Sequence, residues 1–525
     1  MENTEIIDTS IASQSQKRKI DATKKQIRGS SLLLLGRFIS IGLNFATQVM
    51  MVRYLSTTDY GSWGYALALV NFFEVFSTLG LKRSISRFIP IYHENEEYEK
   101  LFGTIALVFM TIVINGLLVI SALYLSPELI TKLISGGEQQ PVALLLIMIF
   151  LVPVEAVDET MIGLFASFAS PRAIFFRKYV LTPLLKMLVV GLLILLGESV
   201  FFLAYGYLAA SIVGILIYSW VFIRVLRSEG VLQHFRLKAM KIPAKEIFAF
   251  TIPLLTSDMV NVLMHSTDTI LIGFFNGTAE VARYRVILPA AHFNKMVMTS
   301  FAFLFTPLAA RFFARKDYKG INTLYWQTAV WMGVLSFPVF ALTFSMAKPL
   351  TVALYGSRYE ASWILLQMLS FGYYFNCALG FNGLTLKVLG KVRYVVIINV
   401  AASVLNLAGN LLLIPKYGAL GATIATAGSM IVHNILKQAG LKMASGMSIF
   451  DWHYLSFYLI ISGATVCIYV IQLFTHNNIY LDLAIVAIFT IGVFRLSAKR
   501  LDVENTFPEL LKIPVLKTLL KTKGK

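Results

Sequence analysis

The sequence predicts an all-α polytopic membrane protein with about 14 transmembrane helices. Hydrophobic residues make up 57% of its 525 residues and charged residues only 14%, whereas soluble globular proteins carry about 25% charged residues. Apolar runs of roughly 20 residues recur between residues 30 and 494, and each can cross a hydrocarbon core of about 30 Å. Polar side chains also recur at matching positions in two halves of the chain. These observations exclude a soluble enzyme.

Each predicted span is one of these apolar runs, bounded by polar or basic residues. The first 29 residues are polar and basic, and no small-residue cleavage site follows the first run, so we expect no removed signal peptide. The predicted spans are residues 31–52, 61–81, 101–125, 141–163, 174–196, 199–223, 247–275, 281–310, 322–346, 361–386, 394–414, 419–440, 453–475 and 479–496.

The distribution of Lys and Arg predicts the orientation. The great majority of the 46 Lys and Arg residues fall in segments on one side of these spans, which the positive-inside rule assigns to the cytoplasm. We therefore expect a multi-pass protein of the plasma (inner) membrane with both termini in the cytoplasm. The net charge of +18 is spread over many cytoplasmic segments, where anionic lipid headgroups account for it, so we expect no nucleic-acid partner.

Spans one and seven carry polar side chains at matching positions when the chain is shifted by 221 residues. In each span the five positions occupy an arc of about 100°, which is a single helix face. The matched positions are Arg37, Ser40, Asn44, Thr47 and Gln48 against Asp258, Asn261, His265, Asp268 and Thr269, and the same shift pairs Asp59 with Glu280, Asn71 with His292 and Glu74 with Lys295.

This repeat predicts the domain organisation. Six spans per repeat is an even number, so both repeats have the same orientation, and we expect a pseudo-twofold axis along the membrane normal. The longest cytoplasmic connection separates them. The expected segments are a basic cytoplasmic tail over 1–29, an N-lobe over 30–224, a linker over 225–245, a C-lobe over 246–444, two additional C-terminal helices over 453–496, and a basic cytoplasmic tail over 497–525.

The polar faces of spans one and seven cannot point at lipid. An aspartate at the centre of a membrane helix costs roughly 2.5–3.5 kcal/mol, while each Leu, Ile, Val or Phe returns only about 0.3–0.6 kcal/mol. Either the polar groups hold helices together by hydrogen bonds, or they line a hydrated cavity between the lobes. We favour the cavity, because Ser, Thr or Asn would serve for packing, whereas here charges of opposite sign stand at matched positions.

Other polar residues within the spans are weaker candidates. Lys186 lies halfway along span five, too far from either end to reach water easily. An acidic cluster in span four, Glu155 with Asp158 and Glu159, could bind a cation or relay protons, but we favour pairing with Arg172 or Arg177. No nucleophile elbow, phosphate-binding glycine loop, zinc spacing or dinucleotide fingerprint occurs in the sequence, so we expect no enzyme and no cofactor.

Four segments together resemble the polysaccharide flippases, which handle O-antigen and other lipid-linked oligosaccharides, in the superfamily that also contains multidrug extruders and lipid II flippases. No single segment is a signature, but their order and spacing match over about residues 30–445. The segments are RYLSTTDYGSWGYALALVNFFEVFSTLGLKRSISRFIP, TPLAARFFARKDYKG, LYGSRYEASWILLQMLSFG and LGKVRYVVIINVAASVLNLAGNLLLIPKYGALGATIAT.

The resemblance implies two six-helix lobes that form a V and open alternately to each side. It also implies a flippase that moves a polyprenyl-pyrophosphate-linked oligosaccharide from the inner to the outer leaflet, for surface polysaccharide or glycoprotein assembly. In related flippases basic residues of the first spans face the cavity, and Arg37 occupies such a position. The acidic seventh span departs from this pattern: Asp258 and Asp268 either pair with Arg37 or Lys295, or take up Na⁺ or H⁺.

We therefore expect two groups of site residues, and other polysaccharide-assembly membrane proteins as partners beside the glycan and membrane lipids. The alternative is a multidrug cation/H⁺ or Na⁺ antiporter of the same superfamily, which the acidic residues favour and the basic ones oppose. The expected substrate-binding residues are Arg37, Asn44, Gln48, Lys186, His292 and Lys295, and the expected gating or ion-coupling residues are Glu74, Asp258, Asn261, His265 and Asp268.

Overall fold

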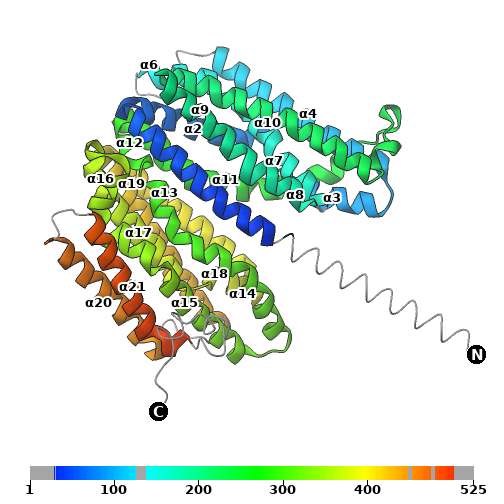
Figure 1. Cartoon of the computed structure of the whole chain (residues 1–525). Helices are drawn as coiled ribbons and strands as arrows, with labels where there is room; N and C mark the ends of the chain where they lie inside the picture. The colour runs from blue at the N-terminus through cyan, green and yellow to red at the C-terminus, as the bar shows by residue number, and fades with distance from the viewer. Residues whose placement is uncertain are drawn as a thin grey trace, which may run out of the picture. The chain divides into compact units, whose positions relative to one another are not determined.

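The structure is a computed structural model that describes residue 29 and residues 31–125, 138–168, 170–446, 452–474 and 479–501. All regular secondary structure in these residues is helical, and none of them lies in a strand (Figure 1). The predicted fold class is therefore confirmed. Contacts divide the described helices into two compact units, and each unit has its own core.

Three helices contribute residues to both units. Unit 1 comprises the described residues within Met1–Leu55, Leu69–Ile130 and Val142–Val262, and unit 2 those within Ser56–Ala68, Thr131–Pro141 and Leu263–Lys525. The first residues of α2 (Thr57–Thr78) and α6 (Gln139–Met148) belong to unit 2, and α11 (Ala244–Asn276) runs from unit 1 into unit 2. The predicted lobes stay a prediction, because this grouping follows contacts and not the sequence repeat.

The remaining helices fall within one unit each. Unit 1 also contains the helix Ser31–Tyr54, α3 (Lys82–Glu94), α4 (Tyr98–Leu125), α7 (Leu151–Ser167), α8 (Pro171–Ile174), η1 (Phe175–Leu181), α9 (Thr182–Leu196), α10 (Val200–Ser228), η2 (Val231–His234) and η3 (Leu237–Ala239). Unit 2 also contains α12 (Thr278–Arg285), α13 (Leu288–His292), η4 (Phe293–Lys295), α14 (Met296–Ala314), α15 (Tyr318–Phe340), η5 (Ala341–Ser345), α16 (Ala347–Tyr355), η6 (Ser357–Ser362), α17 (Trp363–Ala378), α18 (Asn382–Val388), α19 (Val392–Ser445), η7 (Trp452–Tyr454), α20 (Leu455–Gln472) and α21 (Ile479–Leu501).

The described residues contain 10 helices long and apolar enough to cross a membrane, or up to 12 if each of two bent pairs is one span. The predicted number of 14 spans is therefore not confirmed. One reason is α19, in which the predicted spans 394–414 and 419–440 form two helices that meet at a kink and count as one. The two parts of α19 lie against each other, with the Asn406 amide 3.1 Å from the Thr426 hydroxyl, so α19 does not extend as one long helix. Its backbone leaves the helical conformation at Gly418, where φ is 56° and ψ is −132°.

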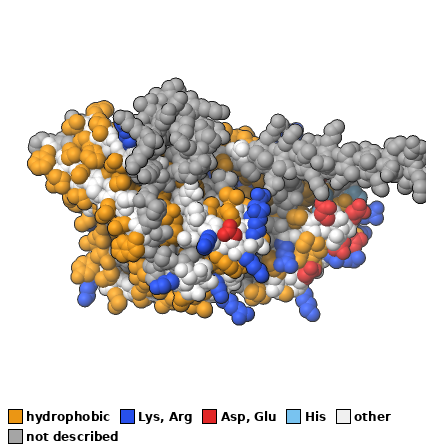
Figure 2. Space-filling model, turned by 90° about the horizontal axis from the view of Figure 1, so that it is seen from below, with side chains coloured by type: hydrophobic (Ala, Val, Ile, Leu, Met, Phe, Trp, Pro, Cys, Tyr) orange, Lys and Arg blue, Asp and Glu red, His pale blue; other side chains and the backbone are white. Residues whose placement is uncertain are grey.

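The outer surfaces of these helices are apolar, as contact with lipid requires. Large hydrophobic side chains such as Leu125 and Leu195, each 82% exposed, would be costly on a soluble protein. Figure 2 shows hydrophobic side chains over much of the described surface in view, with charged side chains in small groups. The chain is therefore a multi-pass membrane protein.

The core of unit 1 is built from aromatic residues on helices that are distant in sequence. Phe165 on α7 meets Phe222 on α10 edge-on, with 5.9 Å between ring centroids. Phe88 on α3 contacts Phe250 on α11 in the same way at 5.6 Å. Lipid tails are as apolar as these side chains, so close packing rather than expulsion of water holds the helices together.

The core of unit 2 is centred on α15. Phe340 at the end of this helix stacks on Tyr374 of α17 with 4.0 Å between ring centroids. The two C-terminal helices α20 and α21 pack against α15 and its continuation η5, where the Ser345 hydroxyl donates to the Thr465 carbonyl at 3.1 Å. In Figure 1 they lie side by side, in orange and red. They are an integral part of this unit.

The connection between α10 and α11 is folded onto unit 1. Lys241 binds Glu99 twice: its backbone N–H donates to the Glu99 carbonyl at 3.2 Å, and its ammonium lies 2.6 Å from the Glu99 carboxylate. That carboxylate raises the pKa of Lys241. His234 also stacks on Tyr98, with 4.1 Å between ring centroids. The predicted linker is therefore anchored to the first turn of α4.

Candidate functional site

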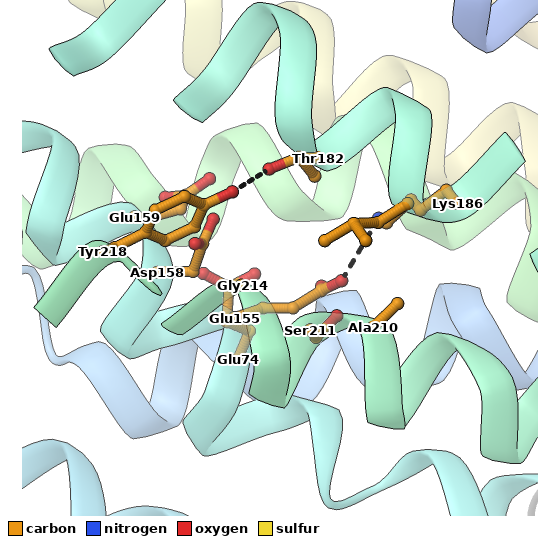
Figure 3. A pocket seen from close by; sticks show the side chains of 11 residues that line it. Glu74, Glu155, Asp158, Glu159, Thr182, Lys186, Ala210, Ser211, Gly214 and Tyr218 are labelled. Atoms are coloured by element: carbon orange, nitrogen blue, oxygen red, sulfur yellow. Dashed lines mark hydrogen bonds and ion pairs between the residues drawn. The ribbon is translucent and has the colours of Figure 1, made fainter. Parts of the chain in front are cut away.

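A cavity of about 680 Å³ lies among α2, α7, α9 and α10 of unit 1 (Figure 3). Four of its lining side chains are acidic and one is basic. Charged groups inside a membrane bundle face protein or water because lipid exposure is costly, so this cavity is a candidate site by its chemistry. The lining residues are Glu74, Glu155, Asp158, Glu159, Thr182, Leu185, Lys186, Ala210, Ser211, Gly214 and Tyr218.

Helix α7 supplies three of the acidic side chains, spaced i, i+3 and i+4, and so placed on one helix face. Each has a basic partner from another element. Lys82 lies 2.5 Å from Glu159, and Arg177 forms an ion pair with Asp158. Lys186 lies 3.7 Å from Glu155. The sequence favoured pairing of this cluster with Arg172 or Arg177, and Arg177 does pair with Asp158, while Lys82 and Lys186 are partners that it did not indicate.

Arg177 is the most deeply buried of these cations, with a side chain only 2% exposed. It lies in η1, a π-helical turn that precedes α9. Its guanidinium carbon is 4.3 Å from the centre of the Tyr218 ring, and the Tyr218 hydroxyl is 2.7 Å from the Thr182 hydroxyl. The ion pair with Asp158 and the aromatic ring offset part of the cost of removing the guanidinium from water, while its Nε and Nη1 atoms have no hydrogen-bond partner among the described residues.

Lys186 is held less tightly. Its distance of 3.7 Å from Glu155 is too long for a good hydrogen bond, although the two side chains point toward one another in Figure 3. Its nitrogen also lies 5.3 Å from the centre of the Tyr207 ring. Glu74 lines the same cavity, and within the described part of the chain it makes no hydrogen bond or ion pair. Four carboxylates thus meet three cations around this cavity.

Unit 2 contains a second cluster, centred on Asp268 of α11. This side chain is 4% exposed and accepts three hydrogen bonds. The Tyr284 hydroxyl on α12 donates at 2.7 Å, the Thr426 hydroxyl on α19 at 2.7 Å and the Asn410 amide on α19 at 2.5 Å. Charge-assisted hydrogen bonds of this kind stabilise a buried carboxylate. Asp268 therefore joins three helices at one point.

Asn410 and Asn406 extend this cluster along α19. The Asn410 amide also lies 3.2 Å from the Asn406 side-chain oxygen. The Asn410 side-chain oxygen is buried and has no hydrogen-bond partner among the described residues. A buried oxygen without a hydrogen-bond partner is costly, and a proton or cation held between it and the neighbouring carboxylate would remove that cost. The oxygen atoms of Asp268, Thr426 and these asparagines are of the type that hard cations bind.

Two predicted residues of unit 2 converge on one tyrosine. His292 Nε2 is 2.8 Å from the Tyr373 hydroxyl, and Lys295 Nζ is 4.0 Å from the centre of the same ring. In unit 1, Asn44 is exposed and donates to the Ser40 hydroxyl on its own helix at 3.1 Å, while Arg37 and Gln48 are half-buried. Helix α11 carries Asp258, Asn261 and His265, but their side chains lie outside the described residues.

The sequence analysis missed the neutral partners of these charges. Tyr284, Thr426 and Tyr373 contact Asp268, His292 or Lys295, yet an uncharged hydroxyl gives no strong signal in the sequence, because its burial costs little once it is hydrogen-bonded. The short polar stretch TAEVARYR, which contains Tyr284, is the one sequence signal that could have indicated this residue.

Comparison with known proteins gives consistent matches. The family model described as "Polysaccharide biosynthesis protein" matches residues 27–313, more than half of the chain, and the model MatE matches residues 253–412. The chain is 22% identical over 416 residues to a Shigella flexneri protein named "Putative O-antigen transporter", covering 78% of this chain and 96% of that protein. It is 21% identical over 422 residues to an uncharacterized membrane protein of Methanocaldococcus jannaschii, covering 77% and 81%.

Solved structures share the fold. The lipid II flippase MurJ in an inward closed conformation superimposes with a TM-score of 0.66 at 17% identity, covering 88% of this chain and 98% of that chain. An inward-facing multidrug resistance transporter of the MATE family gives a TM-score of 0.61 at 12% identity, covering 77% and 94%. At these identities the likeness establishes the fold alone and does not identify the substrate.

Proposed function

Because the chain belongs to the polysaccharide biosynthesis protein family, we propose that it is a flippase for a polyprenyl-pyrophosphate-linked oligosaccharide. It moves this lipid from the inner to the outer leaflet by alternating access, for surface polysaccharide or glycoprotein assembly. The observation that carries the proposal is the charged cavity of unit 1, enclosed by helices whose outer faces are apolar. A lipid-linked glycan needs this combination, since its head group is polar and its tail belongs in lipid.

In this proposal basic side chains bind the diphosphate or acidic sugars. Lys186 suits the role because its hold on Glu155 is long, so an anionic head group can replace the carboxylate. Lys295 lies against a tyrosine ring and has no acidic partner among the described residues. Arg37 contributes a third positive charge from the first helix. The neutral residues Asn44, Gln48 and His292 hydrogen-bond the sugar hydroxyls.

The second group of residues gates or couples the cycle. Asp268 takes up Na⁺ or H⁺ in this proposal, which is supported by its burial and by the unsatisfied oxygen of Asn410 beside it. Glu74 contributes the carboxylate without a partner in the cavity of unit 1. On α11, Asp258, Asn261 and His265 act with Asp268. The chain uses no cofactor, lies in the cytoplasmic membrane and has both termini in the cytoplasm.

A cation antiporter of the same superfamily is the second candidate, and the excess of carboxylates around the cavity of unit 1 favours it. Deletion of the gene separates the two functions. A flippase predicts loss of the surface glycan with unchanged resistance to organic cations. Lower resistance with an intact surface glycan would support the antiporter and contradict the flippase.

The direct test is Arg37→Ala in cells that lack the chromosomal copy. We expect the variant to reach the membrane in normal amounts, while lipid-linked glycan accumulates in the inner leaflet. Arg53→Ala is the matched control, because this arginine lies on the same helix but is exposed. Full glycan export by Arg37→Ala would remove Arg37 from the mechanism, and equal loss in both variants would point to a general defect.

A further inference from the structure

The first turns of α2 pack closely against α12, and both segments belong to unit 2. Two glycines make this approach possible. A side chain at Gly61 would collide with the carbonyl oxygen of Thr278, and one at Gly64 would meet the side chain of Arg285. The Arg285 guanidinium donates to the Gly64 carbonyl at 2.9 Å. Gly64 and Arg285 are 221 residues apart, so they are equivalent positions of the sequence repeat.

Residues at and just before the start of α6 also bind both helices. The Thr278 backbone N–H donates to Glu138 at 3.2 Å. Gln140 joins the same assembly, since its amide donates to Asp59 at 2.6 Å and its oxygen accepts from the Ser62 hydroxyl at 2.9 Å. Hydrogen bonds therefore join the beginnings of α2, α6 and α12 to one another. Within the described residues, no ion pair links α2 to α12.

Helix α12 is also tied to Asp268. Tyr284, the residue before Arg285, donates its hydroxyl to that carboxylate at 2.7 Å. At the other end of α12, Glu280 accepts from the backbone N–H of Ala419 at 3.1 Å, beside the break in α19 at Gly418. This eight-residue helix thus connects the Asp268 cluster to the contact with α2.

We propose that α12 transmits the occupancy of the Asp268 cluster to the α2–α12 contact, with Tyr284 and Arg285 as positioning residues. Tyr284 and Thr426 both donate to the same oxygen of Asp268. When a proton or cation occupies that oxygen, it can no longer accept both hydroxyls as it does now, so at least one hydroxyl must reverse its hydrogen bond or move. Because Tyr284 and Arg285 are adjacent on a short helix, movement of the first displaces the second from Gly64. The contact between α2 and α12 then opens.

This inference rests on the proposed coupling role of Asp268, and a thiol-accessibility experiment tests it separately. The reporter is Val281→Cys, in a background with Cys377→Ala and Cys467→Ala. Val281 is completely buried, and one of its methyl carbons lies 3.7 Å from the position of a Cβ built on Gly64. The protein is reconstituted in nanodiscs, which give a polar maleimide access to both faces. The labelling rate then measures separation of α2 from α12.

We expect slow labelling in the reporter alone and an increase of about fivefold or more with Tyr284→Phe, which removes only the hydroxyl. Tyr325→Phe is the matched control: it removes another buried, hydrogen-bonded hydroxyl of unit 2, and it should leave the rate unchanged. Asp268→Asn should also increase the rate, and the double variant Asp268→Asn/Tyr284→Phe should be no faster than the faster single variant, because both act through one link.

Additive increases, or a Tyr284→Phe rate within about twofold of the reporter, would overturn the proposed link. An equal increase with Tyr325→Phe would also overturn it, since general loosening would then explain the result. The proposed function fails in a different way: if wild-type protein in liposomes does not translocate lipid-linked glycan, the flippase assignment falls. The labelling pattern would still support the mechanical link from Asp268 to α2.

Discussion

Lys186 and Glu155 face each other across the cavity of unit 1 with 3.7 Å between the ammonium nitrogen and the nearest carboxylate oxygen. An ion pair of this length keeps the charges close without a short hydrogen bond. Lys186 is therefore a cation whose partner can be replaced. In the proposed flippase, substrate phosphate would compete with Glu155 for this cation.

Replacement of Lys186 should reduce transport without loss of folded protein. We expect Lys186→Ala to lower the rate of glycan translocation by about tenfold or more, because a charge-assisted contact to phosphate is lost. Lys100→Ala is the matched control: this lysine also pairs with a glutamate, at 3.0 Å, and lies near a tyrosine ring, but outside the cavity. The rate in proteoliposomes measures the effect, and equal rates in the two variants would contradict the assignment.

Replacement of Arg177 should mainly affect stability. Arg177→Ala leaves Asp158 partly buried without its partner, and loss of one member of a buried pair costs about 3–5 kcal/mol. Lys82→Ala breaks the exposed pair with Glu159, which should cost about 1 kcal/mol or less. Thermal unfolding of the purified protein in detergent distinguishes the two. Similar melting temperatures for both variants would show that the Arg177 pair contributes no more stability than the exposed Lys82 pair.

The close approach at Gly61 should tolerate no added methyl group. Gly61→Ala places a carbon against the carbonyl oxygen of Thr278, and overpacking of this kind costs about 1–3 kcal/mol. Gly191→Ala on α9 is the control, because no atom lies within 4 Å of the added carbon. It should be neutral or stabilise the helix by up to about 1 kcal/mol. A Gly61→Ala protein as stable as the parent would show that α2 and α12 can separate without cost.

The break in α19 should require glycine. Gly418 has a φ of 56° with a ψ of −132°, a conformation that other residues adopt only with strain of about 1–3 kcal/mol. A Cβ at Gly418 would also lie 2.9 Å from a Glu280 carboxylate oxygen. We therefore expect Gly418→Ala to lower the melting temperature, and Gly428→Ala, on the same helix in open space, to leave it unchanged or raise it. The reverse order would contradict the described backbone.

The sequence was most informative about the membrane-spanning helices, because contact with lipid requires apolar side chains. Apolar runs marked helices correctly because a lipid-exposed backbone must satisfy its hydrogen bonds within the helix. Two features escaped this signal. The run at 174–196 begins with the π-helical turn η1 that places Arg177, and hydropathy does not register such a turn. The segment after span two forms α3, whose buried face includes Ile85 and Phe88, although its basic residues suggested only a cytoplasmic connection.

The candidate sites divide in the same way. Asp268 and Lys186 could be found because a charge in an apolar run is costly and therefore requires an explanation. Their surroundings could not, since they depend on which distant helices meet. Tyr284 contacts Asp268 across 16 residues, but Thr426 does so across 158. Such separations are set by tertiary packing, which the spacing of polar residues on one helix does not encode.

The assignment of residues 56–68 to unit 2 has a consequence for how the protein can be assembled. A fragment that starts at the linker would contain Thr278 and Arg285 but lack Gly61 and Gly64, their neighbours in the intact chain. The side of α12 that is buried in the intact chain, which includes Thr278 and Val281, would then lack its neighbours. Co-expression of the two halves should therefore restore what neither half attains alone, and during synthesis the C-terminal helices complete their fold on a segment that was inserted into the membrane near the beginning.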